Sequence, residues 1–455
     1  MSFELTRPQL ESLRADVAQG RDSVIQALLA DLHPADIGAI LDQLVLDEAV
    51  YVYRLLDSEV AAEVVLELRE GLREDLLNSL TSREIAEDVL EHIDTDDAAD
   101  VMAELPEDKQ REVIALLDDH EHREDIQELL AYPEGTAGAL MAKELIQVRA
   151  DLSVARAIVE MRRQAEGVDH ASTIYVVDKD GRLQGILPLK DLFFSAESTR
   201  TLIKHICNTD IVRVKATDDV DDVVKLMKKY DVVALPVVDD MEHLIGRITF
   251  DDVMDVMTEE ATEDYQLASG ISEDVDATDS PIVQVRARLP WLLIGLAGGI
   301  ISSRIIAQYE GQLRIDPSMA FFMPLIAATA GNVGVQSSAI VVQGLASGSM
   351  ANVRLVSRMW KELRVALLTA LVCGAVIFAI NFALEQSQAL TYTVSIALFT
   401  VILTAAMFGT VIPLLMDRLK VDPALATGPF VTTLNDIFGL LTYFSVGHLM
   451  YGMLS

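Results

Sequence analysis

The hydrophobic and polar positions of residues 21–130 follow the period of short amphipathic helices, with almost no strand signal. A leucine followed by a capping residue or proline and then by acids recurs every 24 or 25 residues, at Leu32, Leu56, Leu80 and Leu105. Because that order is typical of a helix start, the spacing predicts two short helices per repeat. Such repeats stack into superhelical arrays, which normally offer an interaction surface.

Beyond Gly135 the pattern changes to alternating strands and helices. The first predicted set is helix Leu152–Arg163, strands Thr173–Val177 and Leu183–Pro188, and a helix from Leu189. The second set is helix Val220–Tyr230, strands Ala234–Val238 and Leu244–Ile248, and helix Asp251–Met257. The Val-Val-Asp and Leu-x-Gly segments of the two sets align, and this β-β-α repeat resembles a tandem pair of CBS domains, at about 136–198 and 200–258. CBS pairs commonly sense adenine nucleotides or ions, so the resemblance implies regulation.

A stripe of carboxylates follows the second repeat, at Asp251, Asp255, Glu259 and Glu263. Spacing by four places these acids on one face of a single helix, where like charges repel. A divalent cation bound against another acidic domain would relieve that repulsion, because hard cations prefer carboxylate oxygens. A solvated helix face is the alternative, and we favour the ion because the stripe lies just before the first apolar segment.

Five apolar segments long enough to cross a bilayer follow Arg286-Ala287-Arg288. They are Leu289–Ala307, Ala320–Ala346, Val365–Ala383, Val394–Met416 and Pro423–Met450. The sequence therefore predicts an all-α transmembrane domain of five helices. The whole chain is expected to be a multi-domain membrane protein, with an α-helical repeat domain and an α/β tandem pair ahead of the membrane.

The distribution of basic residues predicts the orientation of these segments. Arg354, Arg358, Lys361 and Arg364 lie between segments two and three, and Arg418 and Lys420 between segments four and five. The positive-inside rule makes both loops cytoplasmic, which places the N-terminal domains inside and the C-terminus outside. Arg304 and Arg314 flank the first outside loop and conflict with this assignment. Residues 1–20 lack the apolar core of a signal peptide, in keeping with a cytoplasmic N-terminal part.

Charge is very unevenly distributed. The chain holds 36 Lys/Arg and 71 Asp/Glu, of which residues 286–455 hold 10 and 7, so the first 285 residues hold 26 and 64, a net charge of −38. This argues against nucleic acid or anionic lipid as a partner of the N-terminal part and favours bound cations, with a solvated acidic surface as the alternative. Cys207 and Cys373 lie far apart and predict neither a disulfide framework nor a zinc site.

The last apolar segment carries an aspartate, Asp436, near its middle. An aspartate at the centre of a membrane helix costs about 2.5–3.5 kcal/mol, so it usually faces a bundle interior or a water-filled path. The second segment contains Asn332, Gln336 and Ser337 among glycines, which offer neutral oxygens suited to a hydrated ion. A small-residue packing seam is the alternative, and Gly295, Gly299 and Ser303 of the first segment are interpreted as such a seam alone.

Two motifs in these segments resemble the MgtE family. Gly331-Asn332-Val333-Gly334-Val335-Gln336-Ser337 is similar to its Gly-Asn-x-Gly-x-Gln-Ser element, and Asp422-Pro423-Ala424 through Asp436 to its Asp-Pro-Ala…Pro…Thr-x-x-Asp element. The resemblance covers essentially the whole chain. It implies a homodimeric magnesium channel of the bacterial inner membrane, related to the SLC41 carriers, with a pore between two protomers. It also implies a gate, which cytosolic Mg²⁺ bound between the acidic domains holds shut.

The resemblance also assigns roles to individual residues. Asp436 is the implied pore site, with Asn332 nearby, contacting the ion directly or through water. Gly428 stands where some relatives have an asparagine, so a side-chain ligand is absent there. The implied connecting-helix acids are Glu259, Glu263 and Asp264, faced by Asp422. Further implied regulatory metal ligands are Asp94, Asp96, Asp100, Asp218, Asp231, Asp251 and Asp255. Asp94, Asp96, Asp97 and Asp100 lie together at one helix start, and a solvated capping cluster explains them at least as well as a cation site.

The predicted domains are an acidic helical repeat domain (1–131), a tandem CBS pair (132–258), a connecting helix (259–285) and the transmembrane domain (286–455). We predict Mg²⁺ uptake gated by Mg²⁺, with an adenine nucleotide at the CBS pair as a further ligand that the resemblance implies. The alternatives are an ion-coupled carrier of the SLC41 type and a membrane-anchored scaffold. An enzyme is disfavoured, because the sequence has no Ser/His/Asp set, nucleotide loop or histidine cluster.

Overall fold

The computed structural model describes residues 6–165, 173–194, 198–273, 275, 280–347, 350, 355–426 and 428–454. The chain divides into two compact units, Met1–Met257 and Thr258–Ser455.

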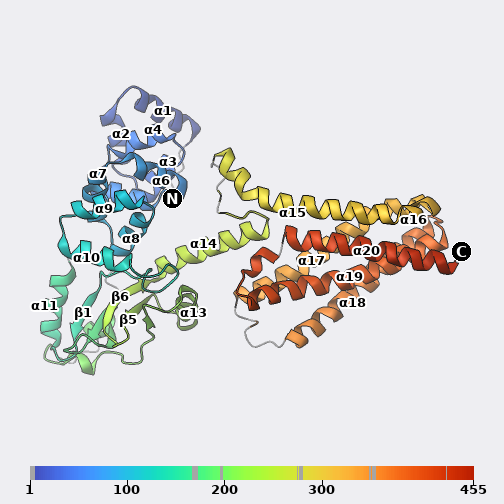
Figure 1. The fold of residues 1–455 in the computed structure, drawn as a ribbon. Helices are drawn as coiled ribbons and strands as arrows, with labels where there is room; N and C mark the ends of the chain where they lie inside the picture. Colours follow the sequence, from blue (N-terminus) through green and yellow to red (C-terminus); the bar gives the residue numbers. More distant parts are fainter. Residues whose placement is uncertain are drawn as a thin grey trace. The chain divides into compact units, whose positions relative to one another are not determined.

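The first unit begins with ten short α-helices that stack in chain order (Figure 1). They are α1 (Arg7–Ala18), α2 (Asp22–Leu29), α3 (Pro34–Leu41), α4 (Leu46–Tyr53), α5 (Ser58–Leu66), α6 (Glu70–Ser79), α7 (Ser82–Asp88), α8 (Thr95–Ala103), α9 (Glu107–Leu116) and α10 (His120–Leu129), with a 3₁₀ turn η1 (Leu90–His92) after α7. The starts of α3, α5, α7 and α9 follow the four recurring leucines, which confirms the predicted period. At α7, Thr81 accepts the amide of Glu84 and completes a capping box.

Neighbouring repeats are joined by polar contacts between residues about 30 apart. The Arg54 Nε atom lies 2.9 Å from Glu84 Oε1, and Ser58 Oγ donates to Asp88 Oδ1 at 2.8 Å. A single hydrophobic core runs beneath these contacts from Leu13 to Ile126. Each repeat therefore stabilises the next one, as expected for a superhelical array.

Two similar three-stranded sheets follow, with orders β1-β2-β3 and β4-β5-β6. Their elements are β1 (Ile146–Arg149), α11 (Val154–Gln164), β2 (Thr173–Val177), β3 (Leu183–Pro188), α12 (Leu189–Phe194), η3 (Ile203–His205), β4 (Val214–Lys215), α13 (Val220–Tyr230), β5 (Ala234–Val238) and β6 (Leu244–Thr249). In each sheet the first pair is parallel and the second antiparallel. Tyr175 and Val238 share a small core that joins the two halves. The predicted repeat is confirmed, whereas the short strands β1 and β4 were not predicted.

Helix α14 (Phe250–Ala268) begins directly after β6 and runs for 19 residues across the boundary between the two units. Asp251, Asp255, Glu259 and Glu263 are all exposed along it. The acidic stripe therefore lies on one continuous helix, as the spacing predicted.

The second unit is a bundle of long helices (Figure 1). It contains α15 (Pro281–Gln308), α16 (Glu310–Ile315), η4 (Pro317–Phe322), α17 (Met323–Ala346), α18 (Leu355–Ala383), α19 (Gln388–Arg418), η5 (Pro423–Ala426) and α20 (Pro429–Leu454). Helix α19 packs against α17, α18 and α20, and α15 packs against α20.

Four helical segments of the described chain are long and apolar enough to cross a membrane: Pro281–Gln308, Pro317–Ala346, Leu355–Ala383 and Gln388–Arg418. The fifth predicted segment forms η5 and most of α20, a 26-residue helix that packs against α15, α17 and α19. Its role as a fifth span stays a prediction.

Two details of the sequence interpretation were wrong. Arg358, Lys361 and Arg364 lie within helix α18 rather than in a loop, while Arg354 lies outside the described residues. A Cβ on Gly295 or Gly299 would meet nothing within 4 Å in the described single chain, so they form no packing seam there.

Candidate functional site

Helices α17 and α20 cross at glycines. A Cβ added to Gly331 would lie 2.8 Å from Thr432 Cγ2 and 3.6 Å from Asp436 Oδ1. A Cβ added to Gly334 would overlap the Nδ2 atom of Asn435. The three polar residues of α20 therefore fit against α17 because α17 has no side chain at those two positions. Helix α17 stays unbroken through this stretch, so its glycines serve close approach rather than helix breaking.

Two further helices approach the same place. A Cβ on Gly298 of α15 would overlap Thr433 Cγ2, and one on Gly409 of α19 would overlap the carbonyl oxygen of Gly334. Glycines of α17 and α15 thus lie against the Thr432–Asp436 segment, and Gly409 of α19 brings a third helix against α17 at Gly334. Such close backbone approach is typical of small-residue packing between helices in membranes.

The side chains at this crossing differ in exposure. Asp436 is half-buried, and Asn332 and Gln336 are exposed on α17 in the single chain. Asn435 is 1% exposed, and neither polar atom of its amide has a hydrogen-bond partner among the described residues. A carboxylate together with amide and hydroxyl oxygens suits a hard cation such as Mg²⁺ or Ca²⁺.

The segment after α14 lies against the start of α20 within the second unit. A Cβ on Gly428 would overlap the carbonyl oxygen of Ala268, and one on Gly270 would lie 2.6 Å from Pro429 Cγ. Gly270 also has a φ of +81°, a conformation that favours glycine. The end of the connecting helix is therefore joined closely to the helix that carries Asp436.

The acids predicted to face each other near the start of α20 come from two elements, α14 and the start of η5. Glu259 and Glu263 are exposed and Asp264 is half-buried on α14. Asp422 is exposed, and its Oδ1 atom accepts the amide of Ala424 at 2.7 Å at the start of η5. The meeting of Asp422 with the three α14 acids stays a prediction.

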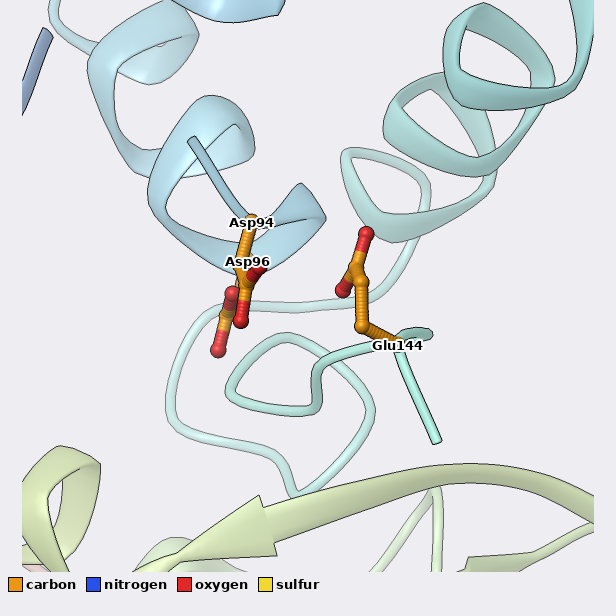
Figure 2. A group of neighbouring side chains, drawn as sticks. All are labelled: Asp94, Asp96 and Glu144. Atoms are coloured by element: carbon orange, nitrogen blue, oxygen red, sulfur yellow. The ribbon is translucent and has the colours of Figure 1, made fainter. Parts of the chain in front are cut away.

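A separate acidic cluster lies in the first unit (Figure 2). One carboxylate oxygen from each of Asp94, Asp96 and Glu144 lies within 4.8 Å of the other two. Asp94 and Asp96 come from the start of α8, and Glu144 comes from the loop before β1. The separation of the three oxygens would allow all three to bind one divalent ion.

Glu144 is held in place by the helix it faces. Its Oε1 atom accepts the backbone amide of Thr95 at 3.2 Å, and its Oε2 atom accepts the Thr95 hydroxyl at 2.9 Å. That hydroxyl also accepts the amide of Lys143 at 3.0 Å. Thr95 is 1% exposed, so this link between α8 and the loop is shielded from water.

Burial and mutual repulsion raise the pKa values of the acids around this cluster. Burial raises the pKa of Asp96 well above its usual range, with Asp97 and Asp252 of α14 as further causes. Burial and Asp252 raise the pKa of Asp97 to about 7, with smaller contributions from Asp94, Asp100 and Asp255. Asp96 Oδ1 is buried without a partner among the described residues. These groups fit a bound cation, which would favour their charged forms.

One buried arginine accompanies the cluster. Arg247 of β6 is 6% exposed, and its Nη2 atom lies 3.7 Å from Asp94 Oδ2. The backbone of Arg247 exchanges hydrogen bonds of 2.8 and 2.9 Å with Ala142. Arg247 therefore supplies a positive charge to a group of at least four carboxylates.

Comparison with known proteins decides the family. Residues 32–135 match the MgtE intracellular N domain, residues 137–197 and 203–259 match CBS domains, and residues 323–446 match the MgtE divalent cation transporter domain. The chain is 33% identical over 453 residues to a magnesium transporter of Thermus thermophilus, covering 96% of this chain and 98% of that one. It belongs to the MgtE family.

A second MgtE relative, from Bacillus subtilis, is 33% identical over 321 residues, 70% of this chain and 71% of that one. The soluble part of a magnesium transporter matches with 29% identity and a TM-score of 0.50, over 56% of this chain and 98% of that structure. The cytosolic domain of the Mg²⁺ channel MgtE in complex with ATP matches with 34% identity and a TM-score of 0.50, over 54% and 99%. The MgtE family consists of magnesium transporters, so the prediction of a non-enzymatic protein is confirmed.

Two further predicted regulatory acids are not part of the group formed by Asp94, Asp96 and Glu144. Asp218 accepts the amide of Lys215 at 2.8 Å in a turn. Asp231 ends α13 in the left-handed conformation, with a φ of 53°. Both have local backbone roles, and their assignment as metal ligands stays a prediction.

The sequence interpretation did not select Glu144 or Asp252 as sites, and it weighed Asp97 only as a member of the acidic cluster at the start of α8. Asp97 and Asp252 stand beside selected acids, and helical periodicity could have ranked them by burial. Glu144 meets Thr95 across 49 positions of the chain, and no local signal in a single sequence reports such a contact.

Proposed function

We propose that two copies of this chain form a Mg²⁺ channel in which the segment Thr432–Asp436 of α20 and the polar face of α17 line the path. The observation that carries this proposal is the glycine-lined crossing, where Gly331 leaves room beside the Asp436 carboxylate. An anchor helix would gain nothing from an aspartate in that position, because burial there is costly.

The chemistry of the crossing favours a hydrated divalent ion. Mg²⁺ gives up water reluctantly, so Asp436 would supply charge while the exposed amides of Asn332 and Gln336 bind ion-bound water. The exposure of both amides in a single chain supports a path completed by a second copy. Paired Asp436 carboxylates across a dimer axis would then favour a divalent cation over a monovalent one.

The proposed path is tested by expressing variants in cells that lack Mg²⁺ import and measuring their growth at limiting Mg²⁺. We expect Asp436→Ala and Asp436→Asn to abolish growth at limiting Mg²⁺, because both remove the charge. Asp417→Asn is the matched control, since Asp417 is exposed at the end of α19. Wild-type growth of either Asp436 variant at equal membrane expression would overturn the path assignment.

We propose further that the acidic cluster is part of a gate that closes when cytosolic Mg²⁺ is high. Asp94, Asp96 and Glu144 converge on one space, and α14 brings Asp252 and Asp255 close to Asp97. Bound Mg²⁺ would neutralise repulsion between these acids and hold the first unit together. Helix α14 continues from there into the segment that packs on Gly428 and Pro429 at the start of α20.

Limited proteolysis of the full-length dimer tests the gate. We expect millimolar Mg²⁺ to slow cleavage of wild-type protein, and Asp96→Asn with Asp97→Asn to remove that protection. Glu134→Gln, a substitution of an exposed acid outside the cluster, is the control. Unchanged cleavage of the wild type with and without Mg²⁺ would show that the acids are merely solvated.

An adenine nucleotide is a further proposed ligand of the CBS pair. The support is the similar cytosolic domain of the Mg²⁺ channel MgtE, whose structure was determined in complex with ATP. Calorimetric titration of the full-length protein with ATP is expected to show binding, and GTP serves as the comparison. Absence of ATP binding would limit the CBS pair to contacts within the protein.

An ion-coupled carrier is the second candidate. Its support is Glu362, a carboxylate that is 6% exposed on α18, which is long and apolar enough to cross a membrane. Sequence interpretation favours a channel because Asp436 is the one ionisable residue expected at depth, and Glu362 weakens that argument. Mg²⁺ uptake into vesicles that changes with an imposed proton or sodium gradient at fixed voltage would favour the carrier.

A further inference from the structure

Helix α18 carries a buried ion pair. The Nη2 atom of Arg358 lies 3.8 Å from Glu362 Oε2, one helical turn away, and the two side chains are 10% and 8% exposed. The hydroxyl of Ser337, on α17, donates to the other carboxylate oxygen, Oε1, at 2.7 Å. Ser337 is also buried, at 5% exposure. A charged pair on one helix is thus connected to a serine of another helix away from water.

Burying such a pair is costly. Two charges taken out of water lose several kcal/mol of hydration each, and their mutual attraction offsets this only with good geometry and further hydrogen bonds. Here the Nε atom of Arg358 is buried without a partner in the described part of the chain. Well-packed apolar side chains would serve stability as well, so the pair calls for a functional explanation.

The position of Ser337 suggests that explanation. Ser337 follows Gln336 directly and Asn332 by five positions on α17. Because successive residues of a helix are rotated by about 100°, a bond from Ser337 to α18 sets the direction in which Gln336 and Asn332 point. A second constraint on the rotation of α17 comes from Gly334, which lies against Asn435 of α20.

Helix α17 packs closely on α19 and α20, which limits its rotation on those sides, whereas its principal contacts do not include α18. Apolar contacts between helices are non-directional, and a hydrogen bond to a carboxylate has a defined geometry. The bond from Ser337 to Glu362 is therefore a directional link between α17 and α18, which share few other contacts.

We propose that Glu362 is a positioning residue for transport: paired with Arg358, it accepts the Ser337 hydroxyl and holds α17 at the rotation that turns Asn332 and Gln336 toward the ion. This inference rests on the proposed path between α17 and α20. It assigns Glu362 no contact with Mg²⁺ and no proton transfer.

The test compares Ser337→Ala with Ser337→Thr in vesicles of purified protein. Loss of the hydroxyl is expected to raise the KM for Mg²⁺ about tenfold, the size of one lost hydrogen bond to a charged group, and threonine is expected to restore it. The ratio of Mg²⁺ to Co²⁺ uptake should change in the alanine variant alone. Ser395→Ala is the matched control, because the Ser395 hydroxyl donates at 2.8 Å within its own helix.

A double variant shows whether Ser337 acts through Glu362. In a Glu362→Gln background the acceptor is neutral, so adding Ser337→Ala is expected to raise KM by less than about threefold. All rates are divided by the amount of folded dimer, which separates positioning from loss of protein. An unchanged KM and ion ratio in Ser337→Ala would overturn the inference, as would a full tenfold effect in the Glu362→Gln background.

The proposed path and the proposed role of Glu362 can be contradicted independently of each other. Transport by Asp436→Ala would remove the path itself whatever the Ser337 variants do. Loss of transport in Asp436→Ala together with wild-type kinetics in Ser337→Ala would keep the path and remove the role of Glu362.

Discussion

At the scale of single residues, the packing of α20 against its neighbours depends on the positions of glycines, which have no side chain. Thr432, Thr433, Asn435 and Asp436 occupy successive faces of α20, and glycines of neighbouring helices contact each of these faces. A carboxylate can be kept at that depth only if the surrounding helices leave room for it and for ion-bound water. In the proposed path, these glycines would serve the chemistry of Asp436 as well as helix packing.

Gly334→Ala is expected to reduce transport at least about tenfold and to lower thermal stability. The new Cβ would overlap Asn435 Nδ2, and overpacking of a close contact typically costs about 1–3 kcal/mol. Uptake per folded dimer and the melting temperature are the measurements. Gly295→Ala is the matched control, because its Cβ meets nothing within 4 Å in the described chain. Equal behaviour of the two variants would contradict the close crossing of α17 and α20.

At the scale of elements, the acidic cluster arises where three separate elements meet. The start of α8, the loop before β1 and the first turns of α14 each contribute acids, and β6 contributes Arg247. Each element alone would keep its carboxylates in water. Their assembly creates the repulsion that a divalent cation would relieve.

Arg247→Gln is expected to tighten Mg²⁺ binding at this cluster about threefold or more. Removing a positive charge 3.7 Å from Asp94 makes the site more negative, and the buried glutamine retains polar atoms for its neighbours. The measurement is the Mg²⁺ concentration that gives half-maximal protection from proteolysis. Arg149→Gln, which removes an exposed ion pair with Asp151, is the control. Weaker protection of the folded Arg247→Gln variant would show that Arg247 supports the cluster rather than competing with the ion.

At the scale of the whole molecule, the chain joins an acidic N-terminal part to a helical bundle, and it belongs to a family of magnesium transporters. Its strong negative charge is confined to residues 1–285, so the part proposed to sense cations differs in composition from the part proposed to conduct them. The predicted orientation of the bundle rests on basic residues near its helix ends, such as Arg418 at the end of α19 and Lys420 just after it.

A cysteine at position 452 is expected to react with a membrane-impermeant maleimide in intact cells. The predicted orientation places the C-terminus outside, and a Cβ added to Gly452 would meet nothing within 4 Å in the described chain. Cys207 and Cys373 are first replaced by alanine. The control is Lys420→Cys, which is expected to react only after the cells are opened. The reverse labelling pattern would invert the topology.

Local patterns determined much of this protein. Leucines spaced by 24 or 25 residues predicted the helical repeats, because a helix start depends on adjacent capping residues, as at Thr81. Alternation and turn residues predicted β2, β3 and β5 with their observed bounds. The period of four predicted the acidic stripe of α14, and the cost of burying a charge drew attention to Asp436.

Only the tertiary structure decided which of these residues meet. Glu144 joined Asp94 and Asp96 through Thr95, and Glu362, which lies among basic residues that the sequence assigns to a loop, was found buried against Ser337. Gly298 rather than Gly295 proved to be the close contact of α15. The physical reason is that capping and periodicity act over a few residues, whereas burial and convergence of side chains depend on how distant elements pack.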